Sequence, residues 1–185
     1  PEPVVLPREE GDRADATVLS AVLPVILEQN GFEQTYSDMW WQKLKSGAGI
    51  LGVFWNPSKQ GGQGDVDVRR VDILNLFWEP GVTDIQDSRN VFHVELRDNE
   101  DLLARYPQLE GKLGQGADRP QVYVYDDAID TSKKTAMVDW YYKRDGLLHY
   151  AKIVNGEVLY DSQEDPACAG RGFYAHGQYP FVVTP

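Results

Sequence analysis

The chain has 185 residues, of which 42% are hydrophobic and 11% aromatic, so one domain of ordinary size can bury a core without disulfides or a structural metal. Its apolar runs fall well short of the ~20 residues that cross a bilayer, which disfavours any membrane association through a spanning helix. With 29 acidic and 18 basic residues the formal net charge is −11, and this balance disfavours tight binding to a phosphate backbone.

The first part of the chain predicts an extended arm followed by two helices. Residues 1–13 contain three prolines among charged residues, which favours an extended arm. The next segment shows helical spacing up to the stop signal Asn30-Gly31, with Pro24 expected to kink the helix. Its apolar positions are Val18, Leu19, Val22, Leu23, Ile26 and Leu27. A second amphipathic segment ends at Ser46-Gly47, with Tyr36, Met39, Trp40 and Leu44 on one face.

Strands follow the helices. Residues 48–56 are apolar on both faces, and a glycine-rich turn at 58–64 joins them to residues 65–78, where Val66 and Val68 alternate with acidic residues. This pattern predicts a hairpin, and the slipped alternation at 69–71 indicates a bulge or bend in its second strand. Residues 90–97 predict another strand, and Asp98 can cap a short helix that Pro107 stops.

The last part of the chain carries the clearest pattern. A glycine-rich connector at 108–120 and a polar segment at 123–134 precede residues 135–162, where three strands of period two are joined by Asp145-Gly146 and Asn155-Gly156. These turns predict a three-stranded β-meander. The predicted fold class is therefore α+β: N-terminal helices on a mixed, mainly antiparallel sheet with this C-terminal meander, and residues 14–185 forming a single domain. The expected buried aromatic residues are Trp40, Phe54, Phe77, Trp78 and Trp140.

The stretch FWEPGVTDIQDSRNVFH, residues 77–93, resembles a site because it gathers acidic residues and a histidine between aromatic runs. Glu79, Asp84 and Asp87 do not have the alternating spacing and terminal bidentate Glu of a calcium loop. His93 shares a strand face with Val91 and Glu95, and a lone histidine in a strand is more often structural than a ligand. Pro80-Gly81 is a turn dipeptide, and its following polar side chains can bond to nearby amides. The interpretation is a structural loop.

The remaining candidates are weaker. No serine lies in a G-x-S-x-G or S-x-x-K context, and Cys168 has only His176 near it in sequence, so a buried, inert thiol is favoured over a cysteine hydrolase. The GGQG segment lacks the Lys-Ser/Thr of a phosphate loop and predicts a hairpin tip. An aromatic ladder offers rings for stacking on bases or sugars, although sheet packing explains it equally well. Its members are Trp140, Tyr141, Tyr142, Tyr150 and Tyr160. The sequence thus predicts no catalytic, cofactor-binding or metal-binding residues and favours an interaction module.

Five stretches together resemble the portal proteins of tailed bacteriophages, in order and in spacing. They are PEPVVLPREEGD (1–12), GILGVFWNPS (49–58), GDVDVRRVDILNLFWEPGVTDIQDSRNVFHVEL (64–96), MVDWYYK (137–143) and RGFYAHGQYPFV (171–182). The resemblance implies a fragment that matches the wing of a longer subunit, without the stem helices and the clip. It also implies structural roles, with no catalysis, for one set of residues in the 77–93 stretch. That set is Phe77, Trp78, Pro80, Gly81, Gln86 and Arg89.

The same resemblance implies the biological setting. The full-length parent would form a dodecameric ring at one capsid vertex of the virion, assembled in the host bacterial cytoplasm, with capsid, terminase and tail-adaptor proteins as partners. Double-stranded DNA would pass through its channel without sequence-specific binding, while the fragment alone is expected to be a monomer. The alternative is a small carbohydrate-binding or hydrolytic domain that uses the aromatic meander with Glu79, Asp84 or Asp87, which would require a carboxylate pair ~5–10 Å apart in an aromatic cleft.

Overall fold

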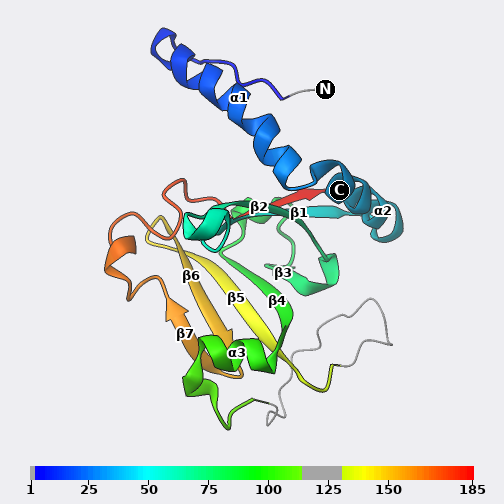
Figure 1. Ribbon diagram of the computed structural model, residues 1–185, viewed down its shortest axis with the longest axis vertical. Helices are drawn as coiled ribbons and strands as arrows, with labels where there is room; N and C mark the ends of the chain where they lie inside the picture. Colours follow the sequence, from blue (N-terminus) through cyan, green and yellow to red (C-terminus); the bar gives the residue numbers. More distant parts are fainter. Residues whose placement is uncertain (1–2, 114–130) are drawn as a thin grey trace. The chain divides into compact units, whose positions relative to one another are not determined.

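The computed structural model describes residues 3–113 and 131–185, and in these ranges the chain forms two compact units (Figure 1). The first unit comprises Pro1–Val71 with Pro180–Pro185, and the second comprises Asp72–Tyr179. N-terminal helices, antiparallel sheets and a meander of strands confirm the predicted α+β class. The expectation of a single domain over residues 14–185 stays a prediction. Most of the predicted connector at 108–120 and polar segment at 123–134 lies outside the described residues.

The first unit combines two helices with a three-stranded antiparallel sheet in the order β2-β1-β8. Its elements are α1 (Arg13–Gln29), α2 (Phe32–Ser46), β1 (Gly49–Asn56), β2 (Asp65–Val71) and β8 (Phe181–Thr184). Helix α2 packs closely on β1, because a Cβ added at Gly49 would lie 2.2 Å from the sulfur of Met39. Ile50, which is fully buried in β1, pairs with both neighbouring strands.

The N-terminal arm runs beside α1 (Figure 1). The amide of Val5 donates to the Ser20 hydroxyl at 2.9 Å, and Ala16 is the one fully buried residue of the helix. Pro24 lies inside α1, so the helix continues through it. Across residues 3–113 and 131–185, no helix combines the length and hydrophobicity needed to span a membrane.

The second unit is built on a five-stranded antiparallel sheet in the order β3-β4-β5-β6-β7. Its elements are β3 (Leu76–Trp78), β4 (Asn90–Asp98), α3 (Asn99–Arg105), β5 (Lys134–Arg144), β6 (Leu147–Val154) and β7 (Glu157–Asp161). Both residues of each predicted meander turn have positive φ, 52° and 76° at Asp145-Gly146 and 49° and 80° at Asn155-Gly156. This conformation is the one that tight hairpins require, and the meander is confirmed.

The predicted strand over residues 65–78 is instead divided between the two sheets. Strand β2 ends at Val71, and β3 begins at Leu76. Between them the carboxylate of Asp72 accepts a hydrogen bond from the Leu74 amide at 3.0 Å and caps the 3-10 turn Ile73–Asn75. The slipped alternation at 69–71 therefore marks the end of a strand, because this local side-chain bond competes with continued pairing.

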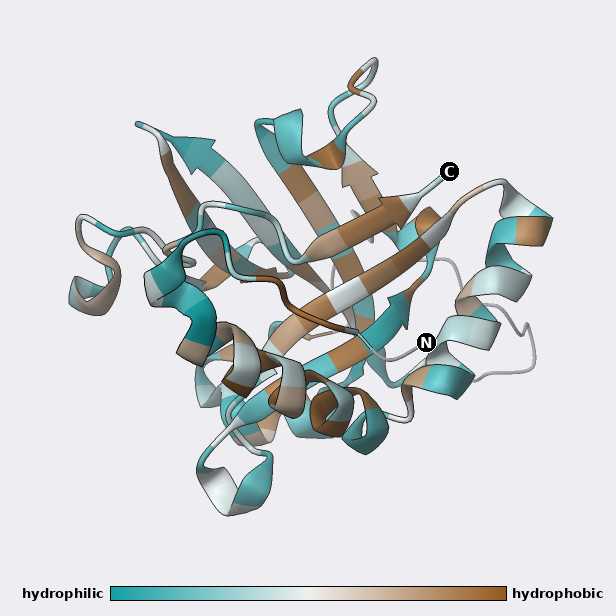
Figure 2. Ribbon diagram, turned by 90° about the horizontal axis from the view of Figure 1, so that it is seen from above, coloured by the Kyte–Doolittle hydropathy of each residue, from teal (hydrophilic) through white to brown (hydrophobic). Residues whose placement is uncertain are grey.

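The predicted burial of five aromatic residues is wrong for two of them, Trp40 and Phe77. Trp40 and Phe77 are 42% and 47% exposed, while Phe54, Trp78 and Trp140 are only partly buried. The second unit contains a buried aliphatic cluster. Its side chains come from α3 and the following turn and from strands β5 and β6. Its members are Leu102, Leu109, Met137 and Val154. Hydrophobic residues run along several strands (Figure 2), and the buried ones are both aliphatic, such as Val91 and Val94, and aromatic, such as Tyr141.

Candidate functional site

The connection between β3 and β4 contains the acidic residues that the sequence singled out, and each has a structural role or faces solvent. Glu79 Oε1 lies 2.7 Å from Arg89 Nη2, and this hydrogen bond lowers the pKa of Glu79. Asp84 accepts from the Gln86 amide at 2.9 Å and caps the short turn Ile85–Asp87, in which Asp87 is exposed. Among the residues that the structure describes, no group of three or more His, Cys, Asp or Glu side chains is placed to hold a metal ion.

A reciprocal pair of hydrogen bonds ties this connection to a segment 93 residues further along the chain. The Tyr179 amide donates to Gln86 Oε1 at 2.8 Å, and Gln86 Nε2 donates to the Tyr179 carbonyl at 3.1 Å. The Tyr179 hydroxyl donates to the Ser88 carbonyl at 2.7 Å, and burial, with Glu79 as a second cause, raises the pKa of Tyr179 to about 12. Lys143 Nζ lies 4.8 Å from the centre of the Tyr179 ring. Gln86 and its neighbours thus anchor the loop.

A row of polar residues crosses the inner face of the five-stranded sheet. His93 on β4 faces Asp139 on β5, which faces Lys152 on β6. His93 Nδ1 lies 3.8 Å from Asp139 Oδ2, and Lys152 Nζ lies 3.9 Å from Asp139 Oδ1. The Tyr150 hydroxyl donates to Asp139 Oδ1 at 2.5 Å. His93 and Asp139 are 4% and 7% exposed, and the ammonium of Lys152 offsets the charge of the Asp139 carboxylate inside the unit.

The electrostatics of the row favour an ionised carboxylate. Burial acts to raise the pKa of Asp139, but the contact with His93, the charge of Lys152 and the Tyr150 hydrogen bond outweigh it and lower the pKa. Burial, followed by the negative charge of Asp139, raises the pKa of Tyr150. The carboxylate therefore remains charged and the phenol neutral near pH 7. An arrangement of this kind fixes the register of neighbouring strands, because a slip of one residue would move every member to the other face.

Sequence reasoning placed His93 in a structural role but missed its partners. Asp139 and Lys152 sit at alternating positions of the meander, where charged side chains ordinarily face solvent. The two hairpin turns determine which residues of neighbouring strands face one another. From these turns the sequence could have shown that Asp139 and Lys152 lie on the same face of the sheet.

The sequence favoured a buried, inert thiol at Cys168 over a pairing with His176, and in the structure the two residues contact different partners. Cys168 is buried, and its sulfur lies 3.8 Å from the Tyr160 hydroxyl, which donates to Asp165 at 2.8 Å. The His176 ring stacks on Tyr174, and its Nδ1 accepts from a backbone amide. The described contact of the buried thiol is thus a phenol hydroxyl rather than an imidazole of the kind that activates a nucleophilic cysteine.

The aromatic ladder divides between the two faces of its sheet. Tyr150 and Tyr160 point inward, where both rings contact Phe173 at 4.6 and 6.3 Å. Trp140 and Tyr142 lie on the opposite face and stack at 4.3 Å between ring centres. That outer row extends over β4 and β3 through Phe92 and Phe77, which are 36% and 47% exposed. The five rings named from the sequence therefore do not form one stacking platform.

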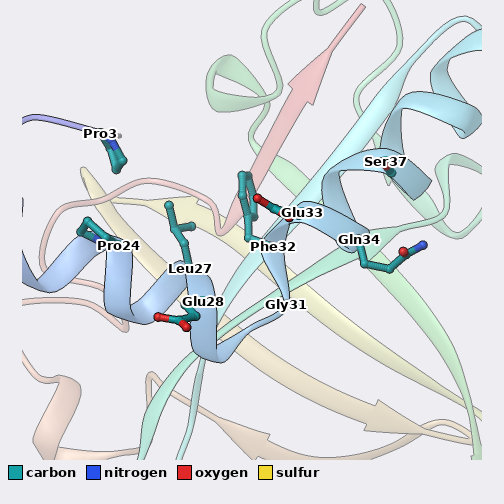
Figure 3. Close-up of a pocket in the computed structure, with 9 residues that line it drawn as sticks. All are labelled: Pro3, Pro24, Leu27, Glu28, Gly31, Phe32, Glu33, Gln34 and Ser37. Carbon is teal, nitrogen blue, oxygen red and sulfur yellow. The ribbon is translucent and has the colours of Figure 1, made fainter. Parts of the chain in front are cut away.

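A groove of about 850 Å³ lies on the first unit between the arm, α1 and α2 (Figure 3). Apolar Pro24, Leu27 and Phe32 line it together with the carboxylates of Glu28 and Glu33. Among the described residues that line it, none is basic and none is a histidine, while two carry carboxylates.

Comparison with known proteins gives one family. The family model described as "Phage P22-like portal protein" matches residues 1–172. A search of curated proteins finds no match to the chain.

Proposed function

Because the chain belongs to the P22-like phage portal protein family, we propose that it is part of a portal subunit, in the ring at one capsid vertex through which double-stranded DNA is packaged and ejected. The single observation that carries the proposal is the extent of the family match, which covers residues 1–172 of 185. The family is structural and assembles as an oligomeric ring with the capsid and other phage proteins. A role as head-tail connector follows from that membership.

The finer assignment is the wing of the subunit. A mixed α+β region with antiparallel sheets suits an outward projection from the ring, and the ring itself would be a dodecamer. Capsid, terminase and tail-adaptor proteins are its proposed partners, with the assembled protein in the virion after assembly in the host bacterial cytoplasm. These assignments extend the family membership by analogy with its architecture.

The charge of the chain is compatible with DNA passage. Sliding requires that phosphates are not held by many Lys and Arg contacts, each of which releases counterions and adds affinity. A net charge of −11 repels the DNA backbone, and so no sequence-specific DNA binding is proposed.

A structural role also explains the site geometry better than catalysis does. A carbohydrate-binding or hydrolytic domain would need a carboxylate pair beside the aromatic rings. Here Glu79 is paired with Arg89 and Asp84 caps a turn, while the ladder is split between two faces. Glu79 and Asp84 are thus engaged in holding the loop, and Asp87 is exposed.

Negative-stain imaging of the purified full-length subunit tests the proposal. We expect closed rings with a central channel, and the region of residues 1–185 at their periphery, where a bound antibody fragment or a fused marker would locate it. Particles without rings would contradict the portal role. Rings with the marker at the channel axis would contradict the wing assignment alone.

A further inference from the structure

The outer face of α1 is apolar and uncovered. Val18, Val22 and Val25 follow one another at spacings of four and three residues, and they are 60%, 43% and 49% exposed. Leu19 beside them is 49% exposed. The helix has no charged residue between Asp15 and Glu28, and the arm occupies its opposite side through Ser20. A stripe of this kind on a surface helix ordinarily packs against another element.

The helix also needs such packing for its own stability. A helix of 17 residues is only marginally stable by itself in water, and β-branched residues such as Val18 and Val22 lower its propensity further. The interior Pro24 removes one backbone hydrogen bond. Tertiary contacts must therefore supply much of the stabilisation of α1.

A second uncovered face lies on α2 of the same unit. Trp41 and Leu44 are 64% and 73% exposed, and the neighbouring Trp40 is 42% exposed. This face is basic at its end, since the last turn of the helix carries Lys43 and Lys45. Each ammonium lies over an indole, with Lys43 Nζ 5.0 Å from Trp40 and Lys45 Nζ 5.7 Å from Trp41.

We propose that the outer face of α1 in one copy of the chain packs against the outer face of α2 in the next copy. Both faces are apolar, and their flanking charges are opposite. Residues 8–15 before the α1 stripe carry four carboxylates against Arg8 and Arg13, and Arg13 pairs with Glu10 at 2.9 Å, so this end is acidic by two charges, whereas the α2 face ends at Lys43 and Lys45. In a chain of net charge −11, this basic end is the place where a second acidic copy meets attraction.

The contact is heterologous, because the two surfaces that meet are different and every copy carries both. Contacts of this type propagate from copy to copy and close into a ring when the rotation permits. The inference depends on the proposed portal function only for that closure. One helix face buries less than the ~1,200–2,000 Å² of a standard interface, so the isolated chain should associate weakly. In a ring, contacts between other parts of the subunits would hold neighbouring copies together. These contacts would raise the effective concentration of the two faces, so that most copies would form the α1–α2 contact.

Two matched variants test the proposal without a change of charge. Val18→Gln/Val22→Gln removes the α1 face, and Trp41→Gln/Leu44→Gln removes the α2 face. Gln has a helix propensity at least equal to that of Val or Trp, so the helices should persist. Leu74→Gln/Val158→Gln, at exposed positions of the second unit, is the control. Far-UV circular dichroism and thermal melts establish that all three variants are folded.

Sedimentation equilibrium at about 0.15 M salt, where the Debye length is about 8 Å, then gives the result. We expect the average mass of the unmodified chain and of the control to rise from monomer through dimer and beyond as concentration approaches about 1 mM. Each face variant alone should remain monomeric. An equimolar mixture should form dimers and stop there, because each partner supplies the face that the other lacks.

Three outcomes would overturn the inference. They are an unmodified chain that remains monomeric at about 1 mM, an α2 variant that still associates through paired α1 faces, and a mixture that stays monomeric while the unmodified chain associates. Imaging of the full-length subunit separates these failures from the portal function. Rings that form whether or not the faces are altered would leave the portal role intact and remove only this contact.

Discussion

Asp139 is the residue whose loss should reveal how the five-stranded sheet is held in register. Asp139→Ala removes the carboxylate that accepts from Tyr150 at 2.5 Å and lies 3.8 and 3.9 Å from His93 and Lys152. The buried hydroxyl and the cationic Lys152 then lose their common partner. Removing one member of a buried charge pair costs about 3–5 kcal/mol, because the remaining charge is left uncompensated. This cost includes the ~1–3 kcal/mol that is lost when the buried Tyr150 hydroxyl is left without its hydrogen-bond acceptor.

Urea unfolding at pH 7, followed by circular dichroism, measures this cost. Asp87→Ala is the matched control, since Asp87 is exposed and its loss should change the free energy of unfolding by less than about 0.5 kcal/mol. A double-mutant cycle with Tyr150→Phe should give a coupling of about 0.5–3 kcal/mol. An Asp139→Ala variant within about 1 kcal/mol of the unmodified chain would refute the structural role of the row.

The same variant has a defined pH dependence. The pKa of Asp139 is lower in the folded protein than the ordinary value of about 3.9, so the folded state favours the ionised carboxylate. Its contribution is therefore complete above about pH 4 and is lost as the pH falls through the folded pKa. The difference in unfolding free energy between the unmodified chain and Asp139→Ala should narrow below pH 4. A constant difference down to pH 2 would show that packing alone accounts for the loss.

Three further predictions follow from the described contacts. Trp140→Ala should cost about 2 kcal/mol, below the ~3–5 kcal/mol of a fully buried tryptophan, because the ring is only partly buried; urea unfolding measures it. Thermal melts with calcium, magnesium or zinc should show no increase in Tm. A metal ion present at 100 times its Kd would stabilise the folded chain by ~2.7 kcal/mol, so binding would be detected. An increase in Tm that is lost in Asp84→Asn/Asp87→Asn would support a metal site at these residues. Tyr179→Phe should cost about 1 kcal/mol near neutral pH through its lost hydrogen bond to Ser88. Because the pKa of Tyr179 is raised to about 12, that stabilisation should be complete below about pH 10 and vanish as the pH rises through 12, which base titration of unfolding would follow.

Local sequence signals predicted those parts of the fold that local chemistry determines. Asp145-Gly146 and Asn155-Gly156 adopt the positive φ that tight hairpins need, so the meander was readable from its turns. The helix ending at Asn30-Gly31 was equally readable, since Gly31 adopts φ of 57° beyond the last turn. In each case the decisive residues are adjacent in sequence.

Features that depend on distant partners were not predictable in this way. Nothing local indicates that the Gln86 side chain would exchange two hydrogen bonds with the backbone of Tyr179, because the two residues are 93 positions apart in sequence. The prediction that Phe77 and Trp40 are buried failed for a related reason. Phe77 and Trp40 follow the apolar pattern of their elements, but pattern alone does not show which face another element covers.

The chain separates the contacts that hold its fold from the surfaces available for association. The row around Asp139 is enclosed within the second unit, whereas the uncovered faces of α1 and α2 belong to the first. Substitutions in the two places should therefore have opposite signatures. Asp139→Ala should lower the free energy of unfolding and leave the concentration dependence of mass unchanged, while Trp41→Gln/Leu44→Gln should abolish association at nearly unchanged stability, since exposed substitutions ordinarily change it by less than about 0.5 kcal/mol. If both variants altered both properties, association and folding would be coupled, as in obligate oligomers whose subunits are unstable alone.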